Sequence, residues 1–247
     1  MVKKFKITTE YDGTDYHGWQ RQKSDRSIQG EIEKALAVMT LQNVALSASG
    51  RTDAGVHALG QVAHFACDTT LTPEAFLLGL NSLLPDDIVV KACETAAETF
   101  HARYDVKQKT YRYRILNREI PSAMDRHYAW YIRRRLLAGD MQAAVEHIVG
   151  RHDFKAFEGT GSPRSSTVRN IFRADLIKKK DGYLIFEIEG DGFLRYMVRN
   201  IVGTLVEVGR GKITPEGFKA ILKSKDRGRA GATAPPHGLF LVSVAYR

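Results

Sequence analysis

The sequence predicts an α+β fold built from two related halves. In each half, segments with strand periodicity are followed by a segment with helical periodicity and then by further strands. Both halves also place an Asp-Gly pair directly after a strand, at Asp12-Gly13 and at Asp191-Gly192. The chain has 247 residues and is 43% hydrophobic and 26% charged, which is ordinary globular usage. We therefore expect two domains, at residues 1–105 and 106–247.

The first half is expected to alternate strands with two amphipathic helices. Apolar and polar residues alternate from Lys4 to Tyr11, which is typical of a half-buried strand. Ser27 is a good N-cap for a helix whose apolar residues recur at helical spacing. Pro73 opens a second helix that runs through Leu84. The other strands of this half are predicted at residues 44–49, 61–67 and 88–93.

Two local patterns define the second half. The pair Asp181-Gly182 lies between two apolar strands and indicates a hairpin. An apolar segment from Leu194 to Val208 has helical periodicity and is followed by Gly209, a typical C-terminal residue. The stretch Glu158 to Ser166 is expected to be a mobile loop. The other predicted elements are a strand at 109–117, a helix at 140–149, hairpin strands at 172–177 and 183–188, a helix from 214 and a strand at 239–246.

The charge balance favours a polyanionic partner. Lys and Arg number 37 against 28 Asp and Glu, a formal net charge of +9. Such a surplus suits nucleic acid or an anionic membrane, but a basic enzyme without such a partner fits equally well. The chain contains no apolar run of the ~20 residues that a membrane helix needs, and its first residues lack a secretory signal core. Cys67 and Cys93 have no CxxC spacing and are typical of buried thiols in a reducing compartment, so we expect a cytoplasmic protein.

The most reactive-looking segment is residues 49–58, SGRTDAGVHA. Two glycines bracket Arg51 and Asp53 between apolar strands, so a sharp loop should project both side chains. Asp53 could serve as a nucleophile or base, with Arg51 keeping it ionised or binding phosphate. An ordinary turn in which Asp53 caps the next element is the alternative. The segment 52–55 also resembles an aspartic-protease loop, but that chemistry needs a second carboxylate loop, which the sequence lacks.

Two other segments carry candidate site residues. Tyr111 lies on a strand where aromatic and basic residues alternate, which could stack a nucleobase on one face and bind phosphate on the other, or could simply pack in a core. On a helical wheel of residues 194–208, Arg195 falls inside the apolar arc and Arg199 lies at its margin. A guanidinium there is costly unless paired, so one of them should meet a buried carboxylate, although Arg195 could also reach solvent.

No cofactor motif is found in the sequence. His57 and His64 are seven residues apart without Cys or acidic neighbours in a metal-binding pattern, so no metal is expected. The chain has neither a phosphate-binding P-loop nor a GxGxxG after a strand, so ATP and nicotinamide cofactors are not implied.

Five segments, in this order, form a specific combination. They are 11–14 with 18–20, 50–58, 109–113, 197–203 and 230–239. Through them the chain resembles the TruA family of tRNA pseudouridine synthases nearly end to end. The resemblance implies two α/β domains, each a mostly antiparallel sheet flanked by helices, with a basic catalytic cleft between them. It also implies an obligate homodimer without cofactor or metal.

The resemblance also implies roles for particular residues. Asp53 corresponds to the catalytic aspartate and Tyr111 to the tyrosine that stacks on the target uracil. Arg51 corresponds to the arginine of the catalytic loop, which contacts substrate and assists base flipping. Arg199 is expected to hold Asp53 ionised, with Arg195 as the second choice. The implied substrate is uridine at positions 38, 39 and 40 of the tRNA anticodon stem-loop.

Two other function classes fit parts of the sequence. A non-catalytic RNA-binding protein would explain the charge and the Tyr111 strand but would leave the Arg51 and Asp53 loop without a role. A nucleotide glycosylase would also flip its substrate, but it would release a free base. The products formed from labelled tRNA distinguish these classes from an isomerase.

Overall fold

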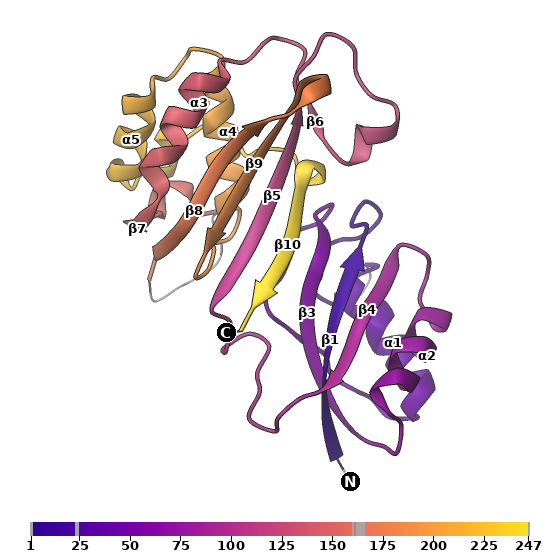
Figure 1. The fold of residues 1–247 in the computed structure, drawn as a ribbon. Helices are drawn as coiled ribbons and strands as arrows, with labels where there is room; N and C mark the ends of the chain where they lie inside the picture. The colour runs from indigo at the N-terminus through magenta and orange to yellow at the C-terminus, as the bar shows by residue number, and fades with distance from the viewer. Residues whose placement is uncertain (1, 23–24, 160, 162–165, 247) are drawn as a thin grey trace. The chain divides into compact units, whose positions relative to one another are not determined.

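The computed structural model describes residues 2–22, 25–159, 161 and 166–246. The chain forms two compact units (Figure 1): unit 1 comprises residues 1–107 and 240–247, and unit 2 comprises residues 108–239. The last strand is therefore grouped with unit 1, whereas the expected domains, 1–105 and 106–247, assign it to the second half; that division stays a prediction about domains. Of the expected loop Glu158 to Ser166, residues 160 and 162–165 lie outside the described residues.

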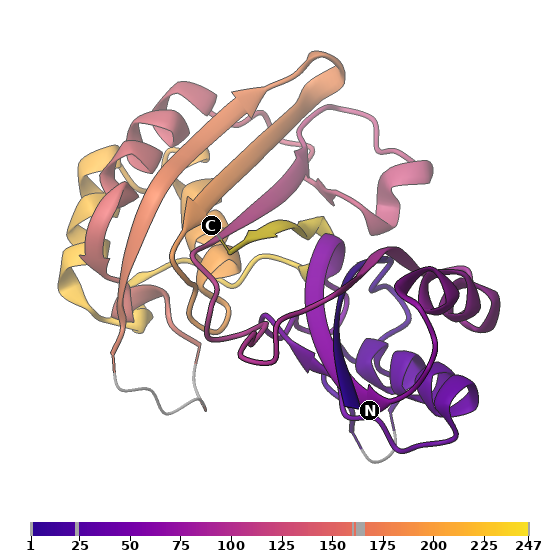
Figure 2. The same cartoon turned by 60° about the horizontal axis from the view of Figure 1, so that its bottom comes forward.

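Unit 1 is a sheet with two helices. The strand order is β4-β1-β3-β10, with β2 also paired to β3. Strand β1 runs antiparallel to both β3 and β4, and β10 runs parallel to β3. In Figures 1 and 2, α1 and α2 lie on the same face of these strands. The bounds are β1 Val2–Tyr11, α1 Ile28–Thr40, β2 Ser47–Ala48, β3 His57–Asp68, α2 Pro73–Leu83, β4 Ile88–Thr95 and β10 Leu239–Ala245.

Unit 2 has an antiparallel sheet covered by helices on one face. The strand order is β5-β9-β8-β7, with the short β6 parallel to β5. The bounds are β5 Gln108–Leu116, β6 Trp130–Tyr131, α3 Ala138–Val145, β7 Gly150–Asp153, β8 Val168–Lys178, β9 Tyr183–Gly190, α4 Met197–Gly209 and α5 Pro215–Ser224. Short 3₁₀ segments lie at Met124–His127, Glu146–Ile148, Lys155–Phe157, Lys180–Gly182, Arg227–Arg229 and Pro236–Gly238. The α+β class and the mostly antiparallel pairing confirm the predicted fold.

Two local predictions, the Ser27 cap and the Asp181-Gly182 turn, are confirmed. The Ser27 hydroxyl accepts a hydrogen bond from the Gly30 amide and caps α1. Asp181 and Gly182 both have positive φ, 64° and 84°, as a tight hairpin between β8 and β9 requires. Within the described residues, no helix combines the length and apolarity needed to cross a membrane.

Helix α4 begins later than predicted. Its first residue is Met197 rather than Leu194, because Tyr196 has a left-handed φ of 59° that interrupts the helical backbone. The Arg195 carbonyl instead accepts a hydrogen bond from the Gly159 amide at 2.8 Å. Arg195 therefore lies outside the helix, and its predicted position in the apolar arc is wrong: its side chain is exposed.

Candidate active site

The loop that carries Asp53 connects β2 to β3 and contains a tight turn. The Val56 amide donates to the Asp53 carbonyl at 3.1 Å, and Gly55 has a φ of 74°, which a side chain would disfavour. Arg51 is exposed, whereas the Asp53 side chain is partly exposed. The loop thus projects both predicted residues, as their spacing between two glycines indicated.

Two other glycines let a second loop approach this turn closely. A Cβ at Gly13 would lie 2.1 Å from the Val56 carbonyl oxygen, and one at Gly18 would lie 2.6 Å from the Thr52 carbonyl oxygen. Neither contact is tolerable, so only glycine fits at these positions. The Trp19 amide donates to the Thr52 carbonyl at 3.1 Å. The loop of residues 12–19 therefore fixes the backbone on both sides of Asp53.

Buried polar groups hold the same turn from the sheet side. A 2.8 Å hydrogen bond joins the Tyr11 and Thr52 hydroxyls, both in the interior. Burial raises the pKa of the Tyr11 phenol, so it keeps its proton at neutral pH. Gln61 accepts from the Ser49 hydroxyl at 2.7 Å and donates to the Gly50 carbonyl at 2.9 Å. Ser49, Gly50 and Thr52 thus each form a hydrogen bond to a buried side chain of strand β1 or β3.

His57 closes the turn on its other side. Its Nδ1 accepts a hydrogen bond from the Gly13 amide at 3.0 Å, and its ring stacks on Phe240 with centroids 4.7 Å apart. The same nitrogen lies 3.0 Å from an Asp12 oxygen. Because a nitrogen that accepts from an amide carries no proton, we assign Asp12 instead to the Thr14 amide, from which it accepts at 2.9 Å. His57 is therefore a support for the loop, a role that its position seven residues before His64 did not indicate.

Tyr111 lies on β5 in unit 2 with its ring half-buried. It meets Phe193 edge to face, with centroids 5.0 Å apart and an interplanar angle of 79°. Two residues along the same face, Tyr113 is fully buried and donates to the Pro235 carbonyl at 2.7 Å. The two tyrosines of the strand thus separate into a core residue, Tyr113, and a partly accessible one, Tyr111.

The basic residues beside Tyr111 are engaged in ion pairs. Arg112 pairs with Glu187 at 2.7 Å, and Arg114 pairs with Asp125 at 2.8 Å. These cations lie on the face opposite Tyr111 and have carboxylate partners within unit 2, and their contact with phosphate stays a prediction.

Arg199 projects from the first turn of α4. Its Nε donates to the Ala234 carbonyl at 2.8 Å, and the guanidinium lies 5.0 Å from the centre of the Tyr196 ring. Its positive charge lowers the pKa of Tyr113, against the larger effect of burial, which raises it. The side chain is half-buried, as its place at the margin of the apolar arc predicted. Its pairing with Asp53 stays a prediction, because the two residues belong to different units.

The segment of residues 230–234 packs closely on α4. A Cβ at Gly203 would lie only 1.7 Å from the Ala232 carbonyl oxygen, so this crossing requires glycine. Asn200, fully buried, accepts from the Thr233 hydroxyl at 2.6 Å and donates to the Phe157 carbonyl at 2.8 Å. Helix α4 is thus held in place next to Arg199 by buried hydrogen bonds.

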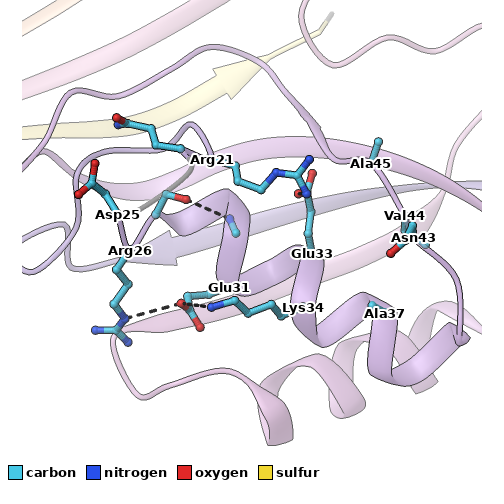
Figure 3. A pocket seen from close by; sticks show the side chains of 13 residues that line it. Arg21, Asp25, Arg26, Glu31, Glu33, Lys34, Ala37, Asn43, Val44 and Ala45 are labelled. Carbon is cyan, nitrogen blue, oxygen red and sulfur yellow. Dashed lines mark hydrogen bonds and ion pairs between the residues drawn. The ribbon is translucent and has the colours of Figure 1, made fainter.

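A separate groove of about 960 Å³ runs along α1 (Figure 3). Its charges compensate one another: Glu31 lies 3.1 Å from Lys34 and 3.8 Å from Arg26. Arg21 lies 2.9 Å from a Glu33 oxygen without hydrogen-bond geometry, so that pair interacts as charges. None of the predicted site residues lines this groove. Among the described residues, no group of three or more His, Cys, Asp or Glu side chains is placed to hold a metal ion.

The comparisons with known proteins identify the class of enzyme. The tRNA pseudouridine synthase family matches this chain at residues 7–105 and 144–247, which is most of its length. The chain belongs to this family, and it is therefore an isomerase that acts on tRNA uridine.

Its curated relatives are similar over nearly their whole length. The chain is 47% identical to tRNA pseudouridine synthase A of Thermoanaerobacter sp. (strain X514), covering 97% of this chain and 98% of the relative. It is 44% identical to tRNA pseudouridine synthase A of Bacillus subtilis (strain 168), covering 98% and 99%. Among solved structures, the archaeal box H/ACA sRNP Nop10-Cbf5 complex matches with a TM-score of 0.34 and 9% identity, over 82% of this chain and 43% of that one. That likeness is too low to support an argument.

Proposed function

We propose that this tRNA pseudouridine synthase modifies uridines 38, 39 and 40 of the anticodon stem-loop, with Asp53 as the reacting carboxylate. The observation that carries the proposal is the placement of Asp53. Its side chain is partly exposed, while the backbone on both sides of it is fixed by the loop of residues 12–19 and by Tyr11. A carboxylate held in this way is suited to reach one atom of a bound nucleotide.

The reaction needs one charged carboxylate. The C1′–N1 bond breaks, the detached uracil turns, and C5 joins C1′; N1 gains a proton and C5 loses one, so atoms and electrons balance. Asp53 either attacks C1′ or removes the 2′ proton to give a glycal, and both routes require the ionised form. The isomerisation involves no redox change, so we propose that it proceeds without metal or organic cofactor.

The target uridine must leave the base stack to reach Asp53. Unstacking costs a few kcal/mol, and stacking of the flipped base on Tyr111 is worth ~1–3 kcal/mol. The half-buried Tyr111 ring, packed against Phe193, is suited to that contact. Arg51 is exposed on the Asp53 loop and is proposed to contact the substrate and assist flipping.

We propose Arg199 as the cation that keeps Asp53 ionised in the bound complex. Burial under a substrate would raise the pKa of the Asp53 carboxyl, and a neighbouring guanidinium opposes that shift. The half-buried Arg199 suits this role better than Arg195, which is exposed. Arg199→Met should reduce both turnover and stability, measured by single-turnover kinetics and thermal unfolding. Wild-type turnover in Arg199→Met would refute the role.

The decisive experiment follows the product made from unmodified tRNA carrying labelled uridine. We expect isomerised nucleoside at positions 38–40, and replacing those uridines with cytidine should abolish pseudouridine formation. Release of free uracil would indicate a glycosylase, and binding without conversion would indicate an RNA-binding protein. We further propose that the enzyme is cytoplasmic and acts as a homodimer. Light scattering of the purified protein tests the oligomeric state.

A further inference from the structure

Three consecutive arginines, Arg133, Arg134 and Arg135, form an exposed cationic segment in unit 2, called here the arginine triplet. Arg133 lies 4.0 Å from Glu119, and both side chains are largely exposed, so that pair is weak. Among the described residues, Arg134 and Arg135 have no carboxylate partner. The triplet thus differs from Arg112 and Arg114, which are committed to ion pairs.

The backbone of the triplet is held by one side chain. Asn117 donates to the carbonyls of Ile132 and Arg134, both at 2.8 Å, and accepts from the Leu136 amide at 2.9 Å. Ile132 and Leu136, on either side, are buried. The main chain is therefore ordered before any ligand arrives, which lowers the entropy cost of binding. Arginine also presents a fixed fork of donors that matches phosphate geometry.

The triplet lies far from the candidate site residues of the same unit. The Leu137 amide donates to the carbonyl of Gly209, the last residue of α4, whereas Arg199 lies in its first turn. At ~1.5 Å per residue the helix separates them by about 15 Å. Along β5, Tyr111 and Asn117 are separated by about 20 Å at ~3.3 Å per residue. The triplet therefore cannot contact the nucleotide that stacks on Tyr111.

We propose that the arginine triplet binds the phosphate backbone of the substrate tRNA on a helical stem remote from the target uridine. A nucleic-acid duplex advances roughly 3.4 Å per base pair, so the contact falls on the order of five base pairs from the target. The triplet contributes affinity and orientation without taking part in the reaction. This inference rests on the proposed function, in that it takes the target uridine to be bound at Tyr111.

The test compares two variants that remove the same charge. In one, Arg133, Arg134 and Arg135 are each replaced by Ala. In the control, Lys178, Lys179 and Lys180 are each replaced by Ala; these lysines are also consecutive and exposed in unit 2. The arginine variant should bind full-length tRNA at least about tenfold more weakly and lower the slope of log affinity against log salt by about 2 to 3. The lysine variant should bind within about threefold of wild type.

Hairpin length and kinetics sharpen the test. A hairpin with a stem of about three base pairs should bind wild type and the arginine variant equally, and a stem of about eight should restore the difference. Turnover at saturating tRNA should stay at the wild-type value, which separates this inference from the proposed function. Unchanged affinity for tRNA, or equal weakening by the lysine control, would overturn it. So would elution of the arginine variant as a smaller particle, which would assign the triplet to a subunit interface.

Discussion

The contacts that hold the backbone in place differ between the Asp53 loop and the start of α4. Around Asp53, the close approaches of Gly13 and Gly18 are made by a neighbouring loop, and buried side chains of strands β1 and β3 add hydrogen bonds. Around Arg199, a single crossing at Gly203 is reinforced by the fully buried amide of Asn200. A loop needs contacts on several sides to be fixed, whereas a helix already fixes its own backbone and needs only one.

Because of this difference, substitutions in the two regions should have different effects on activity and on stability. The Asp53 loop has few apolar side chains of its own, so changes there should affect the reaction more than the fold. Helix α4 is buried along most of its length, so changes there should affect the fold first. Four comparisons between variants can break or sharpen this contrast.

Asp53→Asn should have the largest effect. It keeps the size of the side chain and removes its charge, so turnover should fall by about a thousandfold or more, while tRNA affinity and melting temperature stay near wild type. Asp15→Asn, an exposed position in the neighbouring loop, removes the same charge and should be nearly silent. Turnover of Asp53→Asn within tenfold of wild type would contradict the assignment.

Gly203→Ala should act on stability instead. The added methyl would meet the Ala232 carbonyl oxygen at 1.7 Å, so α4 or the segment 230–234 must move, at a cost of roughly 1–3 kcal/mol or more in the free energy of unfolding. Gly139→Ala, in α3, meets nothing within 4 Å and should stabilise by up to about 1 kcal/mol. Denaturant unfolding measures both, and equal effects of the two substitutions would show that the crossing is not tight.

The substitutions of Tyr111 test whether its ring serves the substrate or only Phe193. Tyr111→Phe should retain tRNA affinity, whereas Tyr111→Leu should weaken binding by about tenfold, because base stacking on an aromatic ring is worth ~1–3 kcal/mol. Turnover by the Phe variant can still fall if the hydroxyl moves a proton at the C5 step. Fluorescence anisotropy with labelled tRNA measures the affinities, and the same value for Phe and Leu would place the base elsewhere.

The smallest expected effect is the coupling between the Tyr11 and Thr52 hydroxyls. Tyr11→Phe should destabilise the protein by about 1–3 kcal/mol, because it leaves the buried Thr52 hydroxyl without this partner. Thr52→Val should cost less, because the Tyr11 hydroxyl keeps its hydrogen bond with the Gln61 side chain. The double variant should cost less than the sum of the two, with a coupling of about 1 kcal/mol. Additive losses in denaturant unfolding would show that the two hydroxyls do not support each other.

Local chemistry was readable from the sequence, and long-range contacts were not. The Ser27 cap and the Asp181-Gly182 turn depend on residues close in sequence, and both are confirmed. The start of α4 was placed three residues too early, because the left-handed Tyr196 depends on its tertiary setting and has no signature in hydrophobic periodicity. The same holds for Arg112, whose partner Glu187 lies on another strand.

The part of the candidate site that lies within one short segment was also predictable. Arg51 and Asp53 share one loop, and the two glycines around them indicated their projection. The supporting roles of Tyr11, His57 and Gln61 were missed, because each contacts a group that is distant in sequence and is brought near only by folding. A signal was present in Gly13 and Gly18, since glycine in a short loop often marks a close backbone approach.

The parallel pairing of β10 with β3 has a consequence for how the protein is made. Phe240 lies opposite His57 in the sheet and stacks on it, so the Asp53 loop is completed by residues that follow all of unit 2 in the chain. Domains emerging from the ribosome usually fold in order from the N-terminus. Here unit 1 must wait with an open strand edge until unit 2 has been translated. The His57 support of the Asp53 loop is therefore completed only after the rest of the scaffold has been made.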